Sequence, residues 1–182
     1  MIFTPLPLAG AFRIDLEKLQ DERGFFARSF CAQEFRSHDL KIHWEQMNIS
    51  FNEHKGTLRG LHFQRPPAAE VKVVRCLRGA IWDVIVDLRT GSIDYGKWCG
   101  VELTSDNRAM VYVPEGFAHG FQTLQAETEI QYLVSVAYSP EHESGLNFND
   151  PDLSIAWPLP VTNISDKDRR QLFLRQIEPL SV

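Results

Sequence analysis

The sequence predicts an all-β domain, folded as a sandwich or a barrel. From about residue 71 onward, short segments rich in β-branched and aromatic residues are separated by Gly, Pro, Asn or Asp. Many short strands at this spacing are typical of sandwiches and barrels. The chain has 182 residues with no internal repeat or linker, which is the length of one domain with a sizeable core. We therefore expect a single domain over residues 1–182.

Two segments carry the strand pattern most clearly. Val71–Arg78 is rich in β-branched residues and is followed by a glycine. Ile81–Leu88 alternates, so we expect its apolar residues on one face and Asp83 and Asp87 on the other. Four further strands are expected over residues 97–103, 109–113, 117–124 and 128–138.

Short helices are expected near both ends of the chain. Residues 15–19 and 32–40 have helical character near the start. Near the end, Ser165 is a suitable N-cap for a helix over residues 169–176, because its hydroxyl can accept a hydrogen bond from a free backbone N–H. The predicted architecture is therefore a β-structure with short flanking helices.

Composition argues against several classes of protein. The formal net charge is −5 and no basic tail is present, which argues against nucleic-acid binding. No apolar stretch approaches membrane-spanning length, and the first residues do not resemble a leader peptide. Three cysteines without a Cys-x-x-Cys pair indicate free thiols in a reducing compartment. We expect a cytoplasmic protein that binds neither nucleic acid nor membrane.

The densest group of chemically useful residues lies in residues 56–64, where two glycines accompany Arg59 and His62. A partly desolvated His62 can act as a general base near neutral pH. Arg59 can hold a diphosphate through bidentate hydrogen bonds. A buried structural histidine beside a surface arginine explains the same residues equally well, so both interpretations stay open at this point.

A second histidine, His119, lies within Pro114–Phe121, in a glycine-rich turn that leads into a strand. The Pro-x-Gly-x-x-His spacing resembles half of the metal-binding signature of cupins, which are double-stranded β-helix, or jelly-roll, barrels. The other half is His-x-His followed by Glu, and the earlier segment supplies only His62. Two imidazoles without a third ligand leave a metal site incomplete. The sequence therefore predicts a cupin jelly-roll barrel that has lost its metal.

Three other residues have a structural and a chemical interpretation each. Lys72 lies between valines, where a lysine is usually an edge residue, but inside a barrel its ammonium can stabilise an enolate oxygen. Tyr132 is typical of a core, but inside a barrel its phenol can deliver a proton. Asp168 forms a Ser-x-x-Asp capping box with Ser165, or orients His62 as in a His–Asp pair.

Taken in order, the motifs of this chain resemble the dTDP-4-dehydrorhamnose 3,5-epimerase family over nearly the whole sequence. The two most specific are Leu58–Gln64, which contains Arg-Gly-Leu-His, and Pro114–Phe121. The others are Asp21–Phe26, Gln46-x-Asn48-x-Ser50, Lys72–Arg75, Asp83–Arg89, Tyr132, Asn149–Pro151, Trp157-Pro158 and Ser165-x-Lys167-Asp168. Together these motifs identify the chain as similar to this family.

The resemblance implies a fold and a set of catalytic roles. The fold is a cupin jelly-roll barrel, usually as a homodimer in which strands are exchanged between subunits. By analogy, His62 is the base that removes the proton next to the C4 ketone, and Asp168 is its partner. Tyr132 is the candidate acid that reprotonates from the opposite face, and Lys72 stabilises the enolate.

The resemblance also implies a substrate site for a nucleoside-diphosphate sugar, most simply a dTDP sugar. Arg59 binds the diphosphate there, joined by Arg23 from the other subunit if strands are exchanged, and His119 lines the sugar pocket. The residues that match substrate-binding positions are Arg23, Phe26, Arg28, Gln46, Asn48, Arg59 and His119.

Arg28 departs from the family pattern, because many members carry Glu at this position. A guanidinium in place of a carboxylate reverses the local charge and exchanges acceptors for donors. The nucleotide base or the sugar substituents can therefore differ from those of dTDP-4-keto-6-deoxyglucose. Whether epimerisation occurs at C3 alone or at C3 and C5 stays open from the catalytic set.

The required chemistry agrees with these residues. Inversion at carbon needs a base on one face, an acid on the other, and a cation for the oxyanion between them. The ketone already makes the neighbouring C–H acidic, so we expect neither a metal nor a redox cofactor. We predict an epimerase acting at C3 and C5 of a nucleoside-diphosphate 4-keto-6-deoxyhexose. The alternatives are a 3-epimerase, a 3,4-ketoisomerase, a metal-dependent cupin oxygenase, and a sugar-nucleotide-binding module without turnover.

Overall fold

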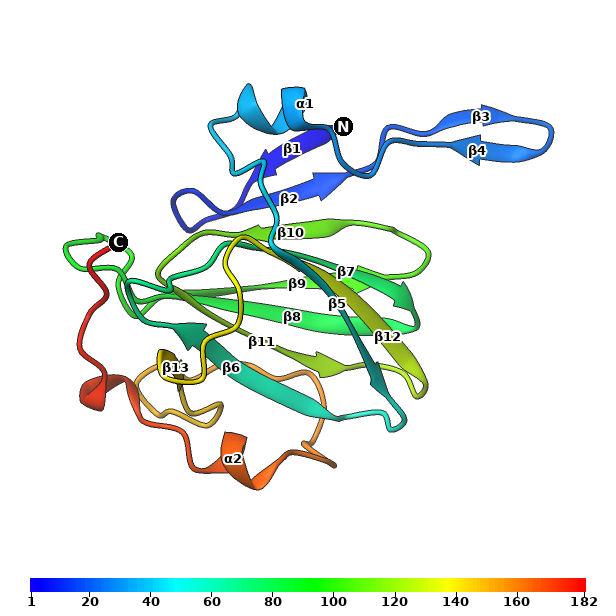
Figure 1. Cartoon of the computed structure of the whole chain (residues 1–182). Helices are drawn as coiled ribbons and strands as arrows, with labels where there is room; N and C mark the ends of the chain where they lie inside the picture. The colour runs from blue at the N-terminus through cyan, green and yellow to red at the C-terminus, as the bar shows by residue number, and fades with distance from the viewer.

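The computed structural model covers residues 1–182 and consists mainly of two antiparallel β-sheets packed against each other (Figure 1). The larger sheet has the spatial order β1 (Ile2–Pro5), β2 (Phe12–Asp15), β10 (Met110–Val113), β7 (Lys72–Arg78), β12 (Thr128–Val134) and β5 (Gln46–Asn52). The smaller sheet has the order β13 (Glu143–Gly145), β6 (Leu58–Gln64), β11 (Phe117–Thr123), β8 (Ala80–Asp87) and β9 (Trp98–Thr104). The prediction of an all-β, cupin-type jelly-roll barrel is confirmed.

The remaining elements flank the barrel. A hairpin arm, β3 (Leu19–Asp21) with β4 (Gly24–Phe26), projects away from it (Figure 1). The helices are α1 (Ala32–Arg36), α2 (Asp166–Arg169) and a 3₁₀ turn (Leu174–Gln176). None of these helices has the length and apolar character that crossing a bilayer requires.

Apolar side chains from both sheets fill one end of the barrel. Val74 and Ile130 of the larger sheet pack with Ile85, Leu103 and Phe121 of the smaller sheet, and all five are buried. Because this cluster closes one part of the interior, the space left between the sheets forms the cavities described below.

The C-terminal segment covers the outer face of the smaller sheet. Leu153, Ile177 and Leu180 pack on Leu61 of β6 and on neighbouring apolar residues of β8 and β11. This packing matters for the site because the same segment carries α2 back to β6.

Four local predictions differ from the structure. Residues 15–19 are not helical, because Asp15 ends β2 and Leu19 begins the hairpin arm. The helix expected over 32–40 ends at Arg36, and the strand expected over 128–138 ends at Val134. The helix expected over 169–176 lies earlier, at Asp166–Arg169, although the predicted N-cap is correct. The strands before residue 71, which include β5 and β6, were not predicted.

The two aspartates of β8 lie on the face opposite Val84 and Val86, as the alternation predicted, and that face points into the barrel. Asp83 and Asp87 are both fully buried, because they share a face with the interior residues Ile81 and Ile85 while the C-terminal segment covers the other face. A carboxylate remains stable there only when it is paired.

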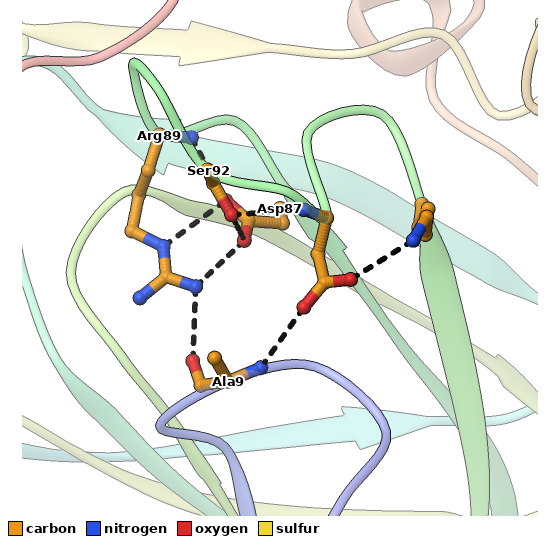
Figure 2. Close-up of polar contacts among 6 residues, drawn as sticks. Ala9, Asp87, Arg89 and Ser92 are labelled. Carbon is orange, nitrogen blue, oxygen red and sulfur yellow. Dashed lines mark hydrogen bonds and ion pairs between the residues drawn. The ribbon is translucent and has the colours of Figure 1, made fainter.

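At the end of β8, Asp87 accepts hydrogen bonds from the guanidinium of Arg89 at 2.6 Å and from the hydroxyl of Ser92 at 2.7 Å (Figure 2). Arg89 also donates to the carbonyl of Ala9, which ties this end of β8 to the turn between β1 and β2 (Figure 2). Burial opposes ionisation of Asp87, but these donors outweigh it and hold its pKa below the usual range. The family-like Asp83–Arg89 segment therefore contains a buried structural anchor.

Candidate active site

The barrel interior contains a main cavity of about 470 Å³ between the two sheets. Its lining residues are Gln46, Asn48, His62, Phe63, Gln64, Glu70, Lys72, Tyr132, Val134, Tyr138 and Glu143. An adjoining cavity of about 160 Å³ is lined by Ser50, Arg59, His62, Lys72, His119, Gly120, Phe121, Ile130 and Tyr132. The two cavities share His62, Lys72 and Tyr132, so these three side chains surround one continuous hollow.

Strand register explains why the two histidines meet in this hollow. β6 and β11 are antiparallel neighbours, and His62 lies directly opposite His119. The strands approach closely because Gly60 faces Gly120: a Cβ on Gly60 would lie 2.7 Å from the carbonyl oxygen of His119, and one on Gly120 would lie 2.7 Å from that of Arg59. Gly60 also has φ +105°, a conformation that side chains rarely adopt.

The larger sheet supplies the opposite wall in the same way. On β12, Tyr132 lies opposite Asn48 of β5, and Val134 lies opposite Lys72 of β7. Lys72 and Tyr132 are therefore diagonal neighbours on adjacent strands, within reach of long side chains. β7 is a central strand, and the Lys72 side chain is only 12% exposed, so the edge-residue interpretation does not apply.

His62 is hydrogen-bonded to a carboxylate from the C-terminal segment. Its Nε2 lies 2.7 Å from Oδ1 of Asp168, and Oδ2 of Asp168 accepts from the backbone N–H of Gly60 at 3.0 Å. Because a carboxylate only accepts hydrogen bonds, Nε2 of His62 carries the proton of this bond. Nδ1 has no hydrogen bond within the chain and is left as the nitrogen that can take up a proton.

Asp168 is held in place by the start of α2. The Ser165 hydroxyl accepts from the backbone N–H of Asp168 at 3.1 Å, so Ser165 is the N-cap while the Asp168 side chain turns to His62. Burial opposes ionisation of Asp168, but the hydrogen bonds from His62 and Gly60 outweigh it and keep its pKa below the usual range. The Asp168 carboxylate is therefore anionic at neutral pH.

A second histidine–carboxylate pair lies deeper in the barrel. Nε2 of His119 is 2.7 Å from Oδ1 of Asp83, and both residues are buried. Oδ2 of Asp83 has no hydrogen-bond partner. Each histidine has its own carboxylate, and no group of three His, Cys, Asp or Glu side chains lies together in an arrangement that would hold a metal ion.

Tyr132 has the protonation that its predicted role needs, and Lys72 forms an ion pair inside the hollow. Burial raises the pKa of Tyr132, and nearby Glu70 adds to this effect while Arg59 opposes it. The phenol therefore keeps its proton at neutral pH. The ammonium of Lys72 forms an ion pair with Glu70 at 3.0 Å inside the cavity.

Arg59 lies at the end of the adjoining cavity and also lines a third cavity of about 310 Å³ near α2. Its Nε donates to Oδ1 of Asn52 on β5 at 2.6 Å. Lys167 contributes a second cation to the third cavity, which His62 and Asp168 also line. Lys167 is paired with Glu143, so Arg59, which forms no ion pair, supplies the free positive charge at this end of the hollow.

A sequence profile described as dTDP-4-dehydrorhamnose 3,5-epimerase matches residues 5–176 of the chain. The chain belongs to this family. The resemblance drawn from the motifs is thus confirmed.

Relatives within the epimerase family agree over nearly the whole chain. A dTDP-4-dehydrorhamnose 3,5-epimerase of Sinorhizobium fredii is 46% identical over 94% of this chain and 88% of its own. A dTDP-4-dehydrorhamnose 3-epimerase of Streptomyces niveus is 37% identical over 97% of this chain and 85% of its own. The crystal structure of a dTDP-6-deoxy-D-glucose-3,5-epimerase from Legionella pneumophila in complex with dTDP-4-keto-L-rhamnose superposes with a TM-score of 0.91, at 35% identity over 99% of this chain and 97% of that one.

Three of the predicted substrate-binding residues do not line the hollow of this epimerase-family chain. Arg23, Phe26 and Arg28 lie on or next to the projecting β3–β4 arm (Figure 1). Arg23 forms an exposed ion pair with Asp21, Phe26 is 71% exposed, and Arg28 pairs with Glu34 at 2.7 Å. The other predicted residues, Gln46, Asn48, Arg59 and His119, all line it.

Several lining residues of the family site were missed by sequence reasoning. Tyr138 donates to Glu143 at 2.7 Å, and Glu143 forms an ion pair with Lys167 at 2.6 Å, which links the rim of the main cavity to α2. These residues lie in a loop and a three-residue strand without a recognisable pattern. Glu70 was detectable, because it lies two positions before Lys72 and alternate residues of an extended chain face the same side.

Proposed function

We propose that this protein is an isomerase that inverts C3 and C5 of a dTDP-4-keto-6-deoxyhexose, converting dTDP-4-dehydro-6-deoxyglucose to dTDP-4-dehydrorhamnose. One observation carries the proposal: the His62–Asp168 pair, the Lys72 ammonium and the Tyr132 phenol surround one hollow. Membership of the epimerase family supports the same reaction.

Each of these groups takes one step in the reaction. His62 removes the proton from the carbon beside the C4 ketone through Nδ1, and Asp168 stabilises the imidazolium that forms. The electron pair moves onto the ketone oxygen as an enolate, which the Lys72 ammonium stabilises. Tyr132 then delivers a proton to the opposite face of the carbon. The imidazolium and the phenolate return to their starting states by proton exchange with solvent before the second carbon reacts.

We propose that Arg59 binds the diphosphate at the positively charged end of the hollow. Gln46 and Asn48 lie along the same cavity wall and supply amide groups for the nucleotide, while His119 contacts the sugar. The nucleotide is proposed to be dTDP because the Legionella relative was crystallised with a dTDP sugar.

We further propose that the protein works as a cytoplasmic homodimer of single-domain subunits. β5 is an edge strand, and its outward residues Met47, Ile49 and Phe51 are 62%, 61% and 47% exposed. An exposed apolar row on an edge strand is a typical association surface. The arm then reaches the partner's cavity and brings Arg23, Phe26 and Arg28 to its substrate, since these residues are remote from the hollow of their own chain.

Deuterium labelling tests the reaction. The protein is incubated in deuterium oxide with 4-keto-6-deoxyhexose nucleotides, and the products are analysed by NMR. Deuterium at C3 and C5 with inverted configuration is expected. Label at C3 alone indicates a 3-epimerase, like the Streptomyces niveus relative. A migrated carbonyl indicates a ketoisomerase, and absence of exchange indicates a binding module.

Two further measurements complete this test. One equivalent of tightly bound iron or manganese, removable only with loss of activity, contradicts the proposal and favours an oxygenase.

Sedimentation analysis checks the dimer. A protein that is monomeric at micromolar concentration and still has full epimerase activity contradicts the exchange of arms.

A further inference from the structure

Glu70 is a carboxylate in the main cavity to which the proposed reaction assigns no step. It lies in the irregular segment just before β7 and lines the cavity with His62, Lys72 and Tyr132. A nearly buried carboxylate in a site for an anionic substrate and an anionic intermediate is unfavourable unless it has a specific role.

The local backbone explains why Glu70 meets Lys72. The residue between them, Val71, is buried in the apolar cluster beneath α1, and its N–H and C=O both bond to Ser135. Because neighbouring residues of an extended chain face opposite sides, Glu70 and Lys72 both turn toward the cavity. Their charged groups lie 3.0 Å apart, and the two side chains are 11% and 12% exposed.

No other ion pair competes for either group. The other titratable or charged residues that line the two cavities are Arg59 and His62 on β6, His119 on β11, Tyr132 on β12, Tyr138 in the following loop and Glu143 on β13. Within this set, Glu143 is paired with Lys167 and His119 with Asp83. Glu70 is therefore the only carboxylate at ion-pair distance from Lys72.

We propose that Glu70 is a positioning residue, which holds the Lys72 ammonium directed into the hollow where the enolate oxygen forms. The inference rests on the proposed function, because it concerns the cation of that reaction. An opposite charge 3.0 Å away fixes where the ammonium lies. The same negative charge disfavours ionisation of the Tyr132 phenol and so helps to keep it protonated as the pH rises.

The test compares Glu70→Gln with the wild type and with a matched control. Gln keeps the size and hydrogen-bonding capacity of the side chain but removes its charge. Glu115→Gln is the control, because Glu115 forms a lysine ion pair of the same 3.0 Å length with Lys41, outside the cavities. The rates of deuterium exchange and epimerisation are measured against pH, together with the Kd for dTDP.

For Glu70→Gln we expect kcat at neutral pH to fall by about tenfold to a hundredfold, less than the hundredfold to thousandfold loss typical when an oxyanion donor is removed. We expect KM and the Kd for dTDP to change by less than about threefold, because the ion pair acts on the enolate rather than on the nucleotide. The alkaline limb of kcat should move to lower pH, because the Tyr132 phenol loses a negative charge that disfavours its ionisation. Glu115→Gln should match the wild type in all three.

Other results overturn the inference. If Glu70→Gln binds dTDP normally and keeps the wild-type kcat, Glu70 does not position Lys72. If kcat rises, the carboxylate mainly repels the enolate. If Gln abolishes dTDP binding, Glu70→Asp decides, because it keeps the charge. A kcat lowered by about tenfold or more then contradicts the inference, whereas a smaller loss supports it. A wild type without exchange overturns the proposed function itself.

Discussion

Replacing Asp168 by Asn should keep the shape of this side chain but stop His62 from acting as the base. Each carboxylate oxygen of Asp168 accepts one N–H, from His62 at 2.7 Å and from Gly60 at 3.0 Å. An amide has only one accepting oxygen. If that oxygen stays with the fixed backbone N–H of Gly60, the amide NH₂ faces Nε2 of His62. Nε2 must then accept, so the proton moves to Nδ1 and the free base nitrogen is lost.

The expected loss of kcat follows from the lost charge of Asp168 as well as from the changed tautomer of His62. In the transition state an imidazolium forms beside a carboxylate that is only 4% exposed. Two unit charges about 4 Å apart attract by about 4 kcal/mol at an effective dielectric constant of 20. Loss of this attraction corresponds to a rate factor of about 10³. The wrong tautomer adds to it, and in a Ser-His-Asp triad the comparable substitution costs about 10⁴. We expect kcat to fall by about 10³ to 10⁴.

The assay is deuterium exchange at C3 and C5, with product formation followed in parallel. KM should change little, because Asp168 acts on His62 and not on the nucleotide. Asp166→Asn is the control: it lies in the same helix, is exposed, and makes no bond to His62. Asp168→Asn with more than a tenth of wild-type kcat would refute the assignment of His62 Nδ1 as the base.

The remaining predictions concern Lys72 on the larger sheet, the close approach of β6 and β11 at Gly120, and the buried Asp87. Lys72→Ala should lower kcat by about 10² to 10³ with a small change in KM, measured by steady-state kinetics, because an oxyanion donor is removed. Gly120→Ala should lower the free energy of unfolding by about 1–3 kcal/mol in urea, because its Cβ would lie 2.7 Å from the Arg59 carbonyl oxygen; unchanged stability would contradict the close strand approach. Asp87→Asn should cost about 2–3 kcal/mol above pH 4, because a buried partner of Arg89 loses its charge. Since folding lowers the pKa of Asp87, its stabilising effect is complete above the unfolded value of about 3.9 and is lost as the pH falls through the lower folded value. The difference in Tm between Asp87→Asn and wild type should therefore shrink below about pH 4.

The sequence predicted the barrel because its later strands are regular. Val71–Arg78 and Ile81–Leu88 alternate or run apolar between turn residues, and such patterns locate strands directly. β5 also alternates, with Met47, Ile49 and Phe51 between the polar residues of its interior face, so this strand was detectable from the sequence. β6 carries Arg59, Gly60 and His62 among its apolar residues and therefore lacks a regular alternation. Asp83 and Asp87 show that an alternation assigns residues to faces without saying which face is covered, because both faces of β8 are buried.

The catalytic set was also predictable as a list but not as an arrangement. His62 and Asp168 are 106 positions apart, and no pattern in the sequence says that α2 returns to β6. Glu143 and Tyr138 were identified as lining residues only from the structure, because single polar residues in irregular segments carry no periodic signal. The arm residues were named from the family motif, and their distance from the hollow of their own chain follows from backbone pairing that sequence alone does not define.

The two halves of the His62–Asp168 pair belong to parts of the chain that are built differently. The imidazole is fixed by an interior strand of a sheet, whereas the carboxylate arrives on a segment that meets the barrel through apolar packing and isolated backbone bridges such as Thr57–Asn163 and Leu146–Leu172. Substitutions of Leu153 or Ile177 in the apolar cluster would therefore shift the Asp168 carboxylate without changing a residue that lines the main cavity. This separation gives natural or laboratory variation a way to alter turnover while the specificity of the pocket is preserved.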